Sequence, residues 1–143
     1  MRETVHVPLG TRAYDVLIGT GLMAQAGAVI SPLLPRPRVA VVTETRVGAL
    51  HMDALSAGLA EAGIDAAVLE LPPGEATKSW AHLGQVTEWL LDQKVERRDV
   101  VVALGGGVIG DLVGFACAIV RRGVRFVQVP TSLLAQVDSS VGG

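Results

Sequence analysis

Three consecutive glycines at the end of a strongly apolar run are the residues of this sequence best suited to holding a phosphate. The run 100–104 leads into Gly105, Gly106 and Gly107, and Val108, Ile109, Gly110 and Asp111 follow, which matches the order G-x-G-x-x-G. Glycines let a pyrophosphate approach backbone N–H groups, and the first turn of a helix presents such groups with a positive partial charge. The spacing predicts a phosphate-binding turn between a buried strand and a helix.

A tight turn without a ligand is the alternative for these glycines. The acid that follows a standard dinucleotide fingerprint by about 20 residues is missing, because Gln128, Val129 and Pro130 stand there. The motif also does not belong to the first strand and helix of the chain. The motif alone therefore does not decide between the two interpretations.

Polar residues also follow three other predicted strands. Ligands of open α/β sheets bind outside the carboxyl ends of the strands, so these residues favour a nucleotide by converging on one edge. We expect Glu44 or Glu75 to hold ribose hydroxyls, and Thr131 and Ser132 to donate to a phosphate. Taken singly, Thr131 is equally explained as a helix cap and Lys78 as a solvated charge. The residues after these strands are Glu44, then Pro73, Gly74, Glu75, Ala76, Thr77 and Lys78, then Thr131 and Ser132.

Three further charged residues have both a functional and a structural explanation. Asp111 is expected near a helix N-terminus, where a carboxylate is favoured by the helix dipole. Asp138 precedes two serines and is also explained as a cap, and Arg122 as a solvated cation at a helix end.

The elements that must position these residues alternate along the chain. Strands are predicted at 4–9, 14–18, 38–42, 66–71, 99–104 and 124–129. Helices are predicted at 22–33, from Thr45 as its cap to a stop at Gly63, at 79–94, from the glycines onward, and from Thr131. This order predicts one α/β domain over 1–143, with a doubly wound, mostly parallel (Rossmann-like) sheet and a short N-terminal β-hairpin.

The composition excludes several classes of function. The 143 residues are 50 % hydrophobic and 3 % aromatic, which suits an aliphatic core of the kind that parallel sheets have. A net charge of −2 with no dense basic cluster argues against nucleic-acid binding. No apolar run reaches the ~18 residues of a membrane span and no signal peptide is visible, so a cytoplasmic protein is expected. His6, His51 and His82 lack metal-ligand spacing, and Cys117 is expected to be a packed thiol.

Four segments together give the chain a family resemblance. It resembles the N-terminal, NAD-binding half of the 3-dehydroquinate synthases, and the resemblance spans the whole chain. The segments are 73–79 (PGEATKS), 104–115 (LGGGVIGDLVGF), 122–132 (RGVRFVQVPTS) and 133–143 (LLAQVDSSVGG).

The resemblance implies a set of NAD-binding residues and two substrate contacts. Arg122 and Asp138 would reach a phosphorylated sugar-acid substrate. A zinc or cobalt ion would be held by a helical C-terminal domain, before which this chain is expected to be truncated, and the full-length enzyme would be a homodimer. NAD would be held by Glu44, Pro73, Gly74, Glu75, Ala76, Thr77, Lys78, Gly106, Gly107, Val108, Ile109, Gly110, Asp111, Thr131 and Ser132.

The implied reaction belongs to the shikimate pathway of aromatic amino acid biosynthesis. It converts 3-deoxy-D-arabino-heptulosonate 7-phosphate to 3-dehydroquinate and phosphate by transient oxidation with NAD, phosphate elimination, re-reduction and aldol cyclisation. The chain alone is expected to be inactive. Open alternatives are another sugar phosphate cyclase, a metal-dependent alcohol or glycerol dehydrogenase, and an NAD-binding module without catalysis.

Overall fold

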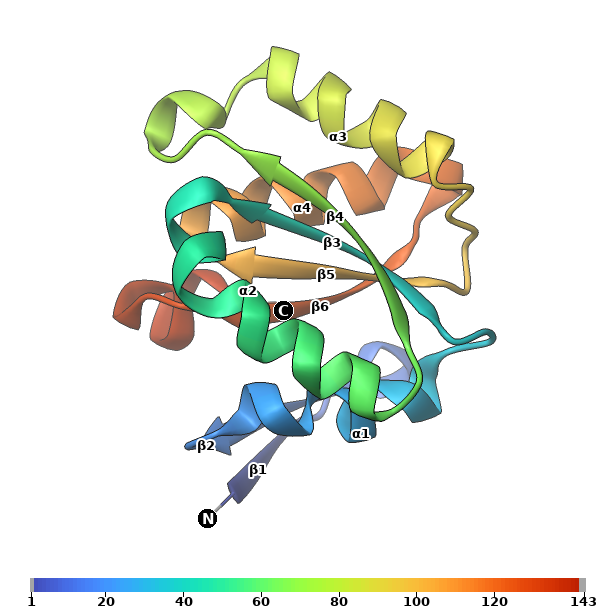
Figure 1. Ribbon diagram of the computed structural model, residues 1–143, viewed down its shortest axis with the longest axis vertical. Helices are drawn as coiled ribbons and strands as arrows, with labels where there is room; N and C mark the ends of the chain where they lie inside the picture. Colours follow the sequence, from blue (N-terminus) through green and yellow to red (C-terminus); the bar gives the residue numbers. More distant parts are fainter. Residues whose placement is uncertain (1, 142–143) are drawn as a thin grey trace.

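The computed structural model describes residues 2–141 and contains a hairpin and a four-stranded sheet with helices on both faces (Figure 1). Met1, Gly142 and Gly143 lie outside the described residues, so the last two residues of the segment 133–143 are not placed. The strands are β1 Arg2–Val7, β2 Tyr14–Gly19, β3 Arg38–Glu44, β4 Asp65–Leu71, β5 Val100–Gly105 and β6 Arg125–Pro130.

The helices follow the predicted alternation. The α-helices are α1 Ala26–Ile30, α2 Thr45–Glu61, α3 Trp80–Asp92 and α4 Gly107–Ile119. Short 3₁₀ turns are η1 Gly10–Arg12, η2 Leu22–Gln25, η3 Ser31–Leu33, η4 Glu75–Thr77 and η5 Val120–Arg122, and η6 Ala135–Ser139 is a π-helical turn.

The larger sheet is parallel throughout, with the strand order β4-β3-β5-β6. The chain moves outward from β3 to β4 and then returns to the other side of β3 to place β5 and β6. This reversal creates a topological switch point between β3 and β5, which is where ligands bind in open α/β sheets. The predicted doubly wound α/β fold is confirmed.

Alternating side chains of the central strands build a core on each face of the sheet. Val41 and Val102 belong to the core under α1 and α2, whereas Val42 and Val101 belong to the core under α3 and α4. Every residue of β5 is buried, as expected for a central parallel strand covered on both faces. The aliphatic composition supplies both cores.

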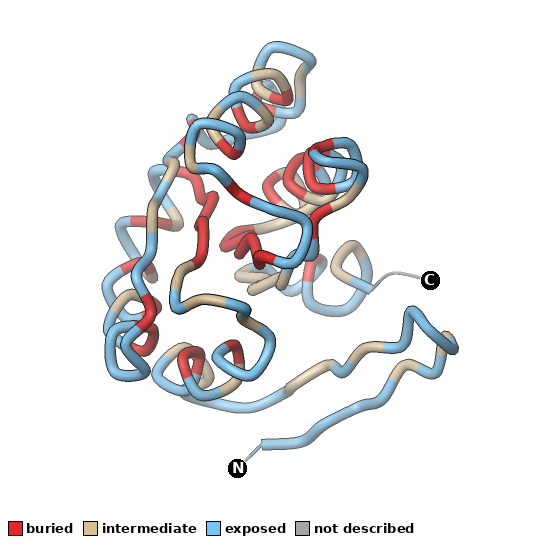
Figure 2. Tube along the Cα trace, turned by 90° about the vertical axis from the view of Figure 1, so that its right-hand side faces the viewer, coloured by how far each residue is buried: buried red, intermediate tan, exposed pale blue. Residues whose placement is uncertain are grey.

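The predicted N-terminal hairpin is confirmed and stands at the margin of the molecule (Figures 1 and 2). β1 and β2 pair antiparallel from Arg2 opposite Gly19 to Val7 opposite Tyr14, with η1 at the turn between them. Most residues of β1 are exposed, including Val5 at 47 %.

The predicted helix at 22–33 is wrong as a single element, because the chain forms η2, α1 and η3 in succession. Pro32 lacks an N–H and lies in the first turn of η3, where its missing donor is tolerated. α1 also approaches α2 closely at two glycines. A Cβ atom on Gly27 would lie 2.2 Å from the carbonyl oxygen of Gly58.

Candidate functional site

A hollow of about 310 Å³ lies at the switch point, at the carboxyl edge of the parallel sheet. Its lining comes from the loops that follow β3, β4, β5 and β6, so the predicted convergence of these strand ends is confirmed. The lining residues are Glu44, Arg46, Val47, Pro72, Pro73, Gly74, Gly106, Gly107, Val108, Ile109, Thr131 and Ser132.

The three long helices begin in different ways near this edge. The carboxylate of Glu44 caps α2 by accepting hydrogen bonds from the N–H groups of Val47 and Arg46, so the cap is Glu44 and not the predicted Thr45. The hydroxyl of Ser79 caps α3. No side chain caps α4, whose N-cap is Gly106.

The uncapped start of α4 faces the hollow, because Gly107, Val108 and Ile109 all line it. The first N–H groups of a helix have no intrahelical partner and carry the positive end of its dipole. An anionic group in the hollow would satisfy these donors. The predicted phosphate-binding turn thus lies at a hollow, and its binding of phosphate stays a prediction.

Some glycines of this turn are also required because side chains of the same domain pack against them. A Cβ atom on Gly105 would lie 2.8 Å from Cβ of Ile109, and one on Gly110 would lie 2.9 Å from Oε1 of Gln128. These two glycines are explained by packing within the domain. A Cβ atom on Gly107 would lie 3.3 Å from Oγ of Ser139, so a side chain at this lining residue would press against η6.

The turn after β4 is held from within. The buried side chain of Thr77 donates a hydrogen bond of 2.5 Å to the carbonyl oxygen of Pro72. Gly74 has φ of +101°, a left-handed conformation that favours glycine. Thr77 thus fixes the turn that brings Pro73 and Gly74 to the hollow, while Glu75, Ala76 and Thr77 are not themselves among its lining residues.

Lys78 and Asp111 form an ion pair between the turn after β4 and α4. Lys78 Nζ lies 2.9 Å from Asp111 Oδ2 and 3.8 Å from Glu75 Oε1. The hydrogen bond to Asp111 is the main cause that raises the pKa of Lys78. Lys78 is therefore paired and not a free solvated charge, and the pair ties the turn after β4 to α4.

Thr131 and Ser132 form the wall after β6. The N–H of Thr131 donates to the carbonyl oxygen of Gly105 at 3.0 Å, which joins this wall to the glycine turn. Oγ of Ser132 accepts from the N–H of Ala135 at 3.2 Å. Ser132, and not Thr131, therefore caps the short helical segment that follows.

Arg122 and Asp138, the two expected substrate contacts, are placed apart. Asp138 lies in η6, which packs beside the start of α4, next to the hollow. Arg122 follows the other end of α4, a helix of 13 residues and therefore roughly 20 Å long. Within one chain, Arg122 and Asp138 therefore lie at opposite ends of α4 and do not form a single site.

Arg46 lines the hollow but is not among the predicted NAD-binding residues. It is the second residue of α2, it is exposed, and it belongs to no motif. Its position two residues after the carboxyl-terminal end of a parallel strand is the signal by which it could have been found.

The described chain does not provide the implied metal site. Within residues 2–141, no three or more His, Cys, Asp or Glu side chains are grouped so that they could hold a metal ion. In the same part of the chain, no helix combines the length and the apolar character needed to cross a bilayer.

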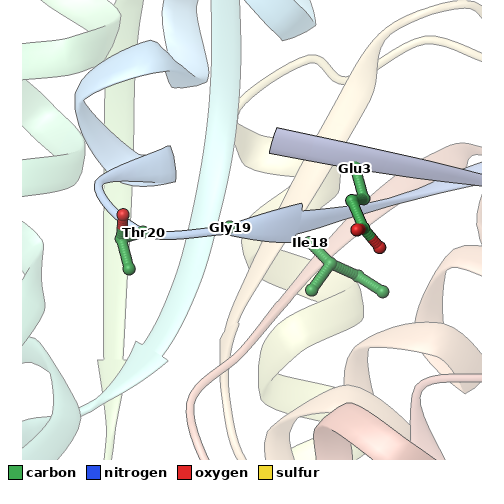
Figure 3. Close-up of a pocket in the computed structure, with 4 residues that line it drawn as sticks. All are labelled: Glu3, Ile18, Gly19 and Thr20. Atoms are coloured by element: carbon green, nitrogen blue, oxygen red, sulfur yellow. The ribbon is translucent and has the colours of Figure 1, made fainter. Parts of the chain in front are cut away.

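A larger hollow of about 490 Å³ lies beside the hairpin and is lined by Glu3, Ile18, Gly19 and Thr20. Figure 3 shows Glu3 of β1 and Ile18 of β2 on the same side of the hairpin, with Thr20 farther along the chain. Among the described residues that line it, Glu3 is the only charged one, and none of them belongs to an α-helix. We therefore assign the candidate site to the smaller hollow.

The fold and this hollow define the class of protein: an α/β domain with a doubly wound parallel sheet and a candidate ligand pocket at its switch point. The model of the family "3-dehydroquinate synthase N-terminal" matches residues 68–143. The chain belongs to this family.

Curated relatives resemble the chain over its full length. It is 70 % identical to the 3-dehydroquinate synthase of Roseobacter denitrificans and 68 % identical to that of Jannaschia sp. (strain CCS1), over all 143 residues in both cases. The chain spans 39 % of the length of each of these relatives.

Solved structures share the fold. A structure of 2-deoxy-scyllo-inosose synthase with carbaglucose-6-phosphate, NAD⁺ and Co²⁺ matches 96 % of this chain and 37 % of its own, with a TM-score of 0.85 and 22 % identity. A structure of 2-epi-5-epi-valiolone synthase from Streptomyces hygroscopicus with NAD⁺ and Zn²⁺ matches 73 % of this chain and 29 % of its own, with a TM-score of 0.70 and 29 % identity.

Proposed function

We propose that this chain is the NAD-binding part of a 3-dehydroquinate synthase. The single observation that carries the proposal is the uncapped N-terminus of α4, which faces a hollow at the switch point of the sheet. Membership of the family supports it, as does the similarity to a cyclase that was crystallised with NAD⁺.

The pyrophosphate of NAD is proposed to bind the N–H groups of Gly107, Val108 and Ile109, with Gly106 giving access to the backbone. Thr131 and Ser132 would donate from the opposite wall. Glu44 would accept from the adenosine ribose with the lone pairs that its capping bonds leave free.

The remaining expected residues would either contact NAD or hold the segments that do. Pro73 and Gly74 would contact the nucleotide directly, since they line the hollow. Glu75, Ala76, Thr77 and Lys78 would hold that turn, and Gly110 and Asp111 would hold the first turns of α4.

For a full-length protein we propose the conversion of 3-deoxy-D-arabino-heptulosonate 7-phosphate to 3-dehydroquinate and phosphate. NAD would supply a hydride acceptor that is regenerated in the same cycle. Asp138, beside the pocket, and Arg122 are proposed substrate contacts. The implied zinc or cobalt ion has no ligand group within residues 2–141, so the chain alone is proposed to bind NAD without turnover. A cytoplasmic location and a homodimeric full-length enzyme stay predictions.

The test is calorimetric titration of the chain with NAD⁺, using wild type and Gly107→Val. The valine would press on Ser139 and add bulk at a lining residue in the first turn of α4, so we expect affinity to fall at least about tenfold. Gly84→Ala is the matched control, because a Cβ atom at Gly84 in α3 meets nothing within 4 Å. Equal NAD⁺ affinity of a folded Gly107→Val protein would contradict the phosphate assignment.

A second measurement tests the enzymatic part of the proposal. Purified chain is mixed with substrate, NAD⁺ and zinc or cobalt, and phosphate release is followed. We expect none. Release by the chain alone would contradict the proposal that it does not turn over substrate.

A further inference from the structure

Arg46 is an unpaired cation in the wall of the hollow. Its backbone N–H donates to Glu44, but its guanidinium has no hydrogen-bond or ion-pair partner within residues 2–141. The guanidinium groups of several other arginines have hydrogen-bond or ion-pair partners. Arg36 pairs with Asp99, and Arg121 donates to the carbonyl oxygen of Val95.

The position of Arg46 makes an added anion favourable. It lies in the first turn of α2, where the helix dipole opposes a cation, and that turn contains no acidic residue. An anion that meets Arg46 would form a charge-assisted bond without breaking an existing pair. It would also offset the unfavourable interaction with the dipole.

The neighbouring carboxylate of Glu44 repels such an anion only weakly. Glu44 is buried, with 7 % of its surface exposed, and both of its oxygens accept N–H bonds from the start of α2. Its negative charge is thus partly offset by the positive end of that helix. Lone pairs remain for a ribose hydroxyl, but the carboxylate is held against the helix.

Gln128, Val129 and Pro130 take the standard position of the ribose-binding acid, but Glu44 and Arg46 place an acid and an arginine at the end of β3, which pairs with β5. An acid at the end of a strand binds the 2′-hydroxyl of the adenosine ribose, whereas a nearby arginine accommodates a 2′-phosphate. We infer that this pocket accepts a 2′-phosphate on the adenosine ribose, that is, NADP⁺ as well as NAD⁺, and that Arg46 sets this tolerance. The inference rests on the proposed NAD-binding function.

The experiment compares the two dinucleotides on the same chain. NAD⁺ and NADP⁺ are titrated into wild type, Arg46→Ser and a control, Arg97→Ser, at low and at high salt. Arg97 is an exposed arginine that precedes β5, at the opposite edge of the sheet, so its replacement changes the net charge equally. We expect wild type to bind NADP⁺ within about tenfold of NAD⁺.

The variants separate a local contact from a general charge effect. Arg46→Ser should weaken NADP⁺ by about tenfold and NAD⁺ by less than about twofold, and added salt should narrow the difference. Arg97→Ser should change neither affinity. Such a pattern would support the inference.

Three results would overturn the inference. An NADP⁺ to NAD⁺ ratio that Arg46→Ser leaves unchanged, with NAD⁺ still bound, removes the role of Arg46 and leaves the proposed function intact. A wild-type affinity for NADP⁺ more than about a hundredfold below that for NAD⁺ would also overturn the inference and leave the proposed function intact. Absence of binding by either dinucleotide rejects the proposed function, and this inference with it.

Discussion

Lys78 and Asp111 join two walls of the candidate pocket, with 2.9 Å between Lys78 Nζ and Asp111 Oδ2. One residue ends the turn that presents Pro73 and Gly74, and the other lies in the second turn of α4. Both side chains are about half exposed, so the pair contributes little to overall stability. Its effect is to hold the two walls at a fixed separation.

Removing either partner should therefore affect binding more than folding. Lys78→Ala and Asp111→Ala are each expected to weaken NAD⁺ binding by about threefold to tenfold, with Tm within about 2 °C of wild type. The double variant should be no worse than either single variant, because both act through one bond. Additive losses in calorimetry would instead mean that each side chain contacts the nucleotide separately.

Gly58 is the glycine whose replacement should cost the most stability. A Cβ atom there would lie 2.1 Å from the carbonyl oxygen of Met23, which is backbone and cannot move aside easily. Gly58→Ala is expected to destabilise the chain by about 3 kcal/mol in urea unfolding. Gly84→Ala, in open space on α3, should stabilise it by about 0.5–1 kcal/mol. Similar midpoints for the two variants would contradict the close approach of η2 and α2.

Asp99 makes the stability of the folded chain depend on pH in the acid range. Burial tends to raise its pKa, but hydrogen bonds from the Arg36 guanidinium at 2.7 and 3.2 Å and from the Glu96 N–H at 2.8 Å outweigh burial and lower it from 3.8. Because the pKa is lower in the folded state, the stabilisation is complete above the unfolded value and disappears as the pH falls through the folded one.

Replacing this carboxylate tests that sign. Asp99→Asn should lower Tm by about 5 °C at pH 7, and the difference from wild type should shrink as the pH falls below 3.8. Thermal unfolding followed by circular dichroism between pH 2.5 and 7 is the measurement. A Tm difference that stays constant over this range would show that Asp99 acts through packing and not through its charge.

Cys117 should be unreactive while the chain is folded. It is buried in the core under α4, and burial raises the pKa of its thiol to about 12. At pH 8 the thiolate fraction is then about 10⁻⁴, and the sulfur is also out of reach of a reagent. Ellman's reagent should react slowly with native chain and rapidly in urea. Rapid reaction of the native chain would disprove the burial.

The strands and the long helices could be predicted from the sequence because their signals are local. Buried runs such as 100–104 are aliphatic throughout, and Gly63 ends α2 with φ of +72°, as a C-terminal stop requires. The helix expected at 22–33 failed because Pro32 and the contact between Gly27 and Gly58 divide it. The second cause is a tertiary contact that no local pattern displays.

The site was predictable in its location but not in its details. Strand ends could be assigned to one edge from the alternation of elements. The shift of the α2 cap from Thr45 to Glu44 is a difference of one residue, yet it engages the expected ribose acceptor with the helix. Arg122 and Asp138 lie apart because α4 runs between them, and sequence order alone does not give that distance.

The hairpin of β1 and β2 implies an uneven response to deuterated solvent. Its backbone amides are held by pairing of these two strands at the margin of the molecule, and a lone two-stranded hairpin is only marginally stable in water. Its amides should exchange through local opening, whereas those of β3 and β5 should exchange only when the whole domain unfolds. The N-terminal 20 residues would then behave as a separate, weaker cooperative unit attached to a stable sheet.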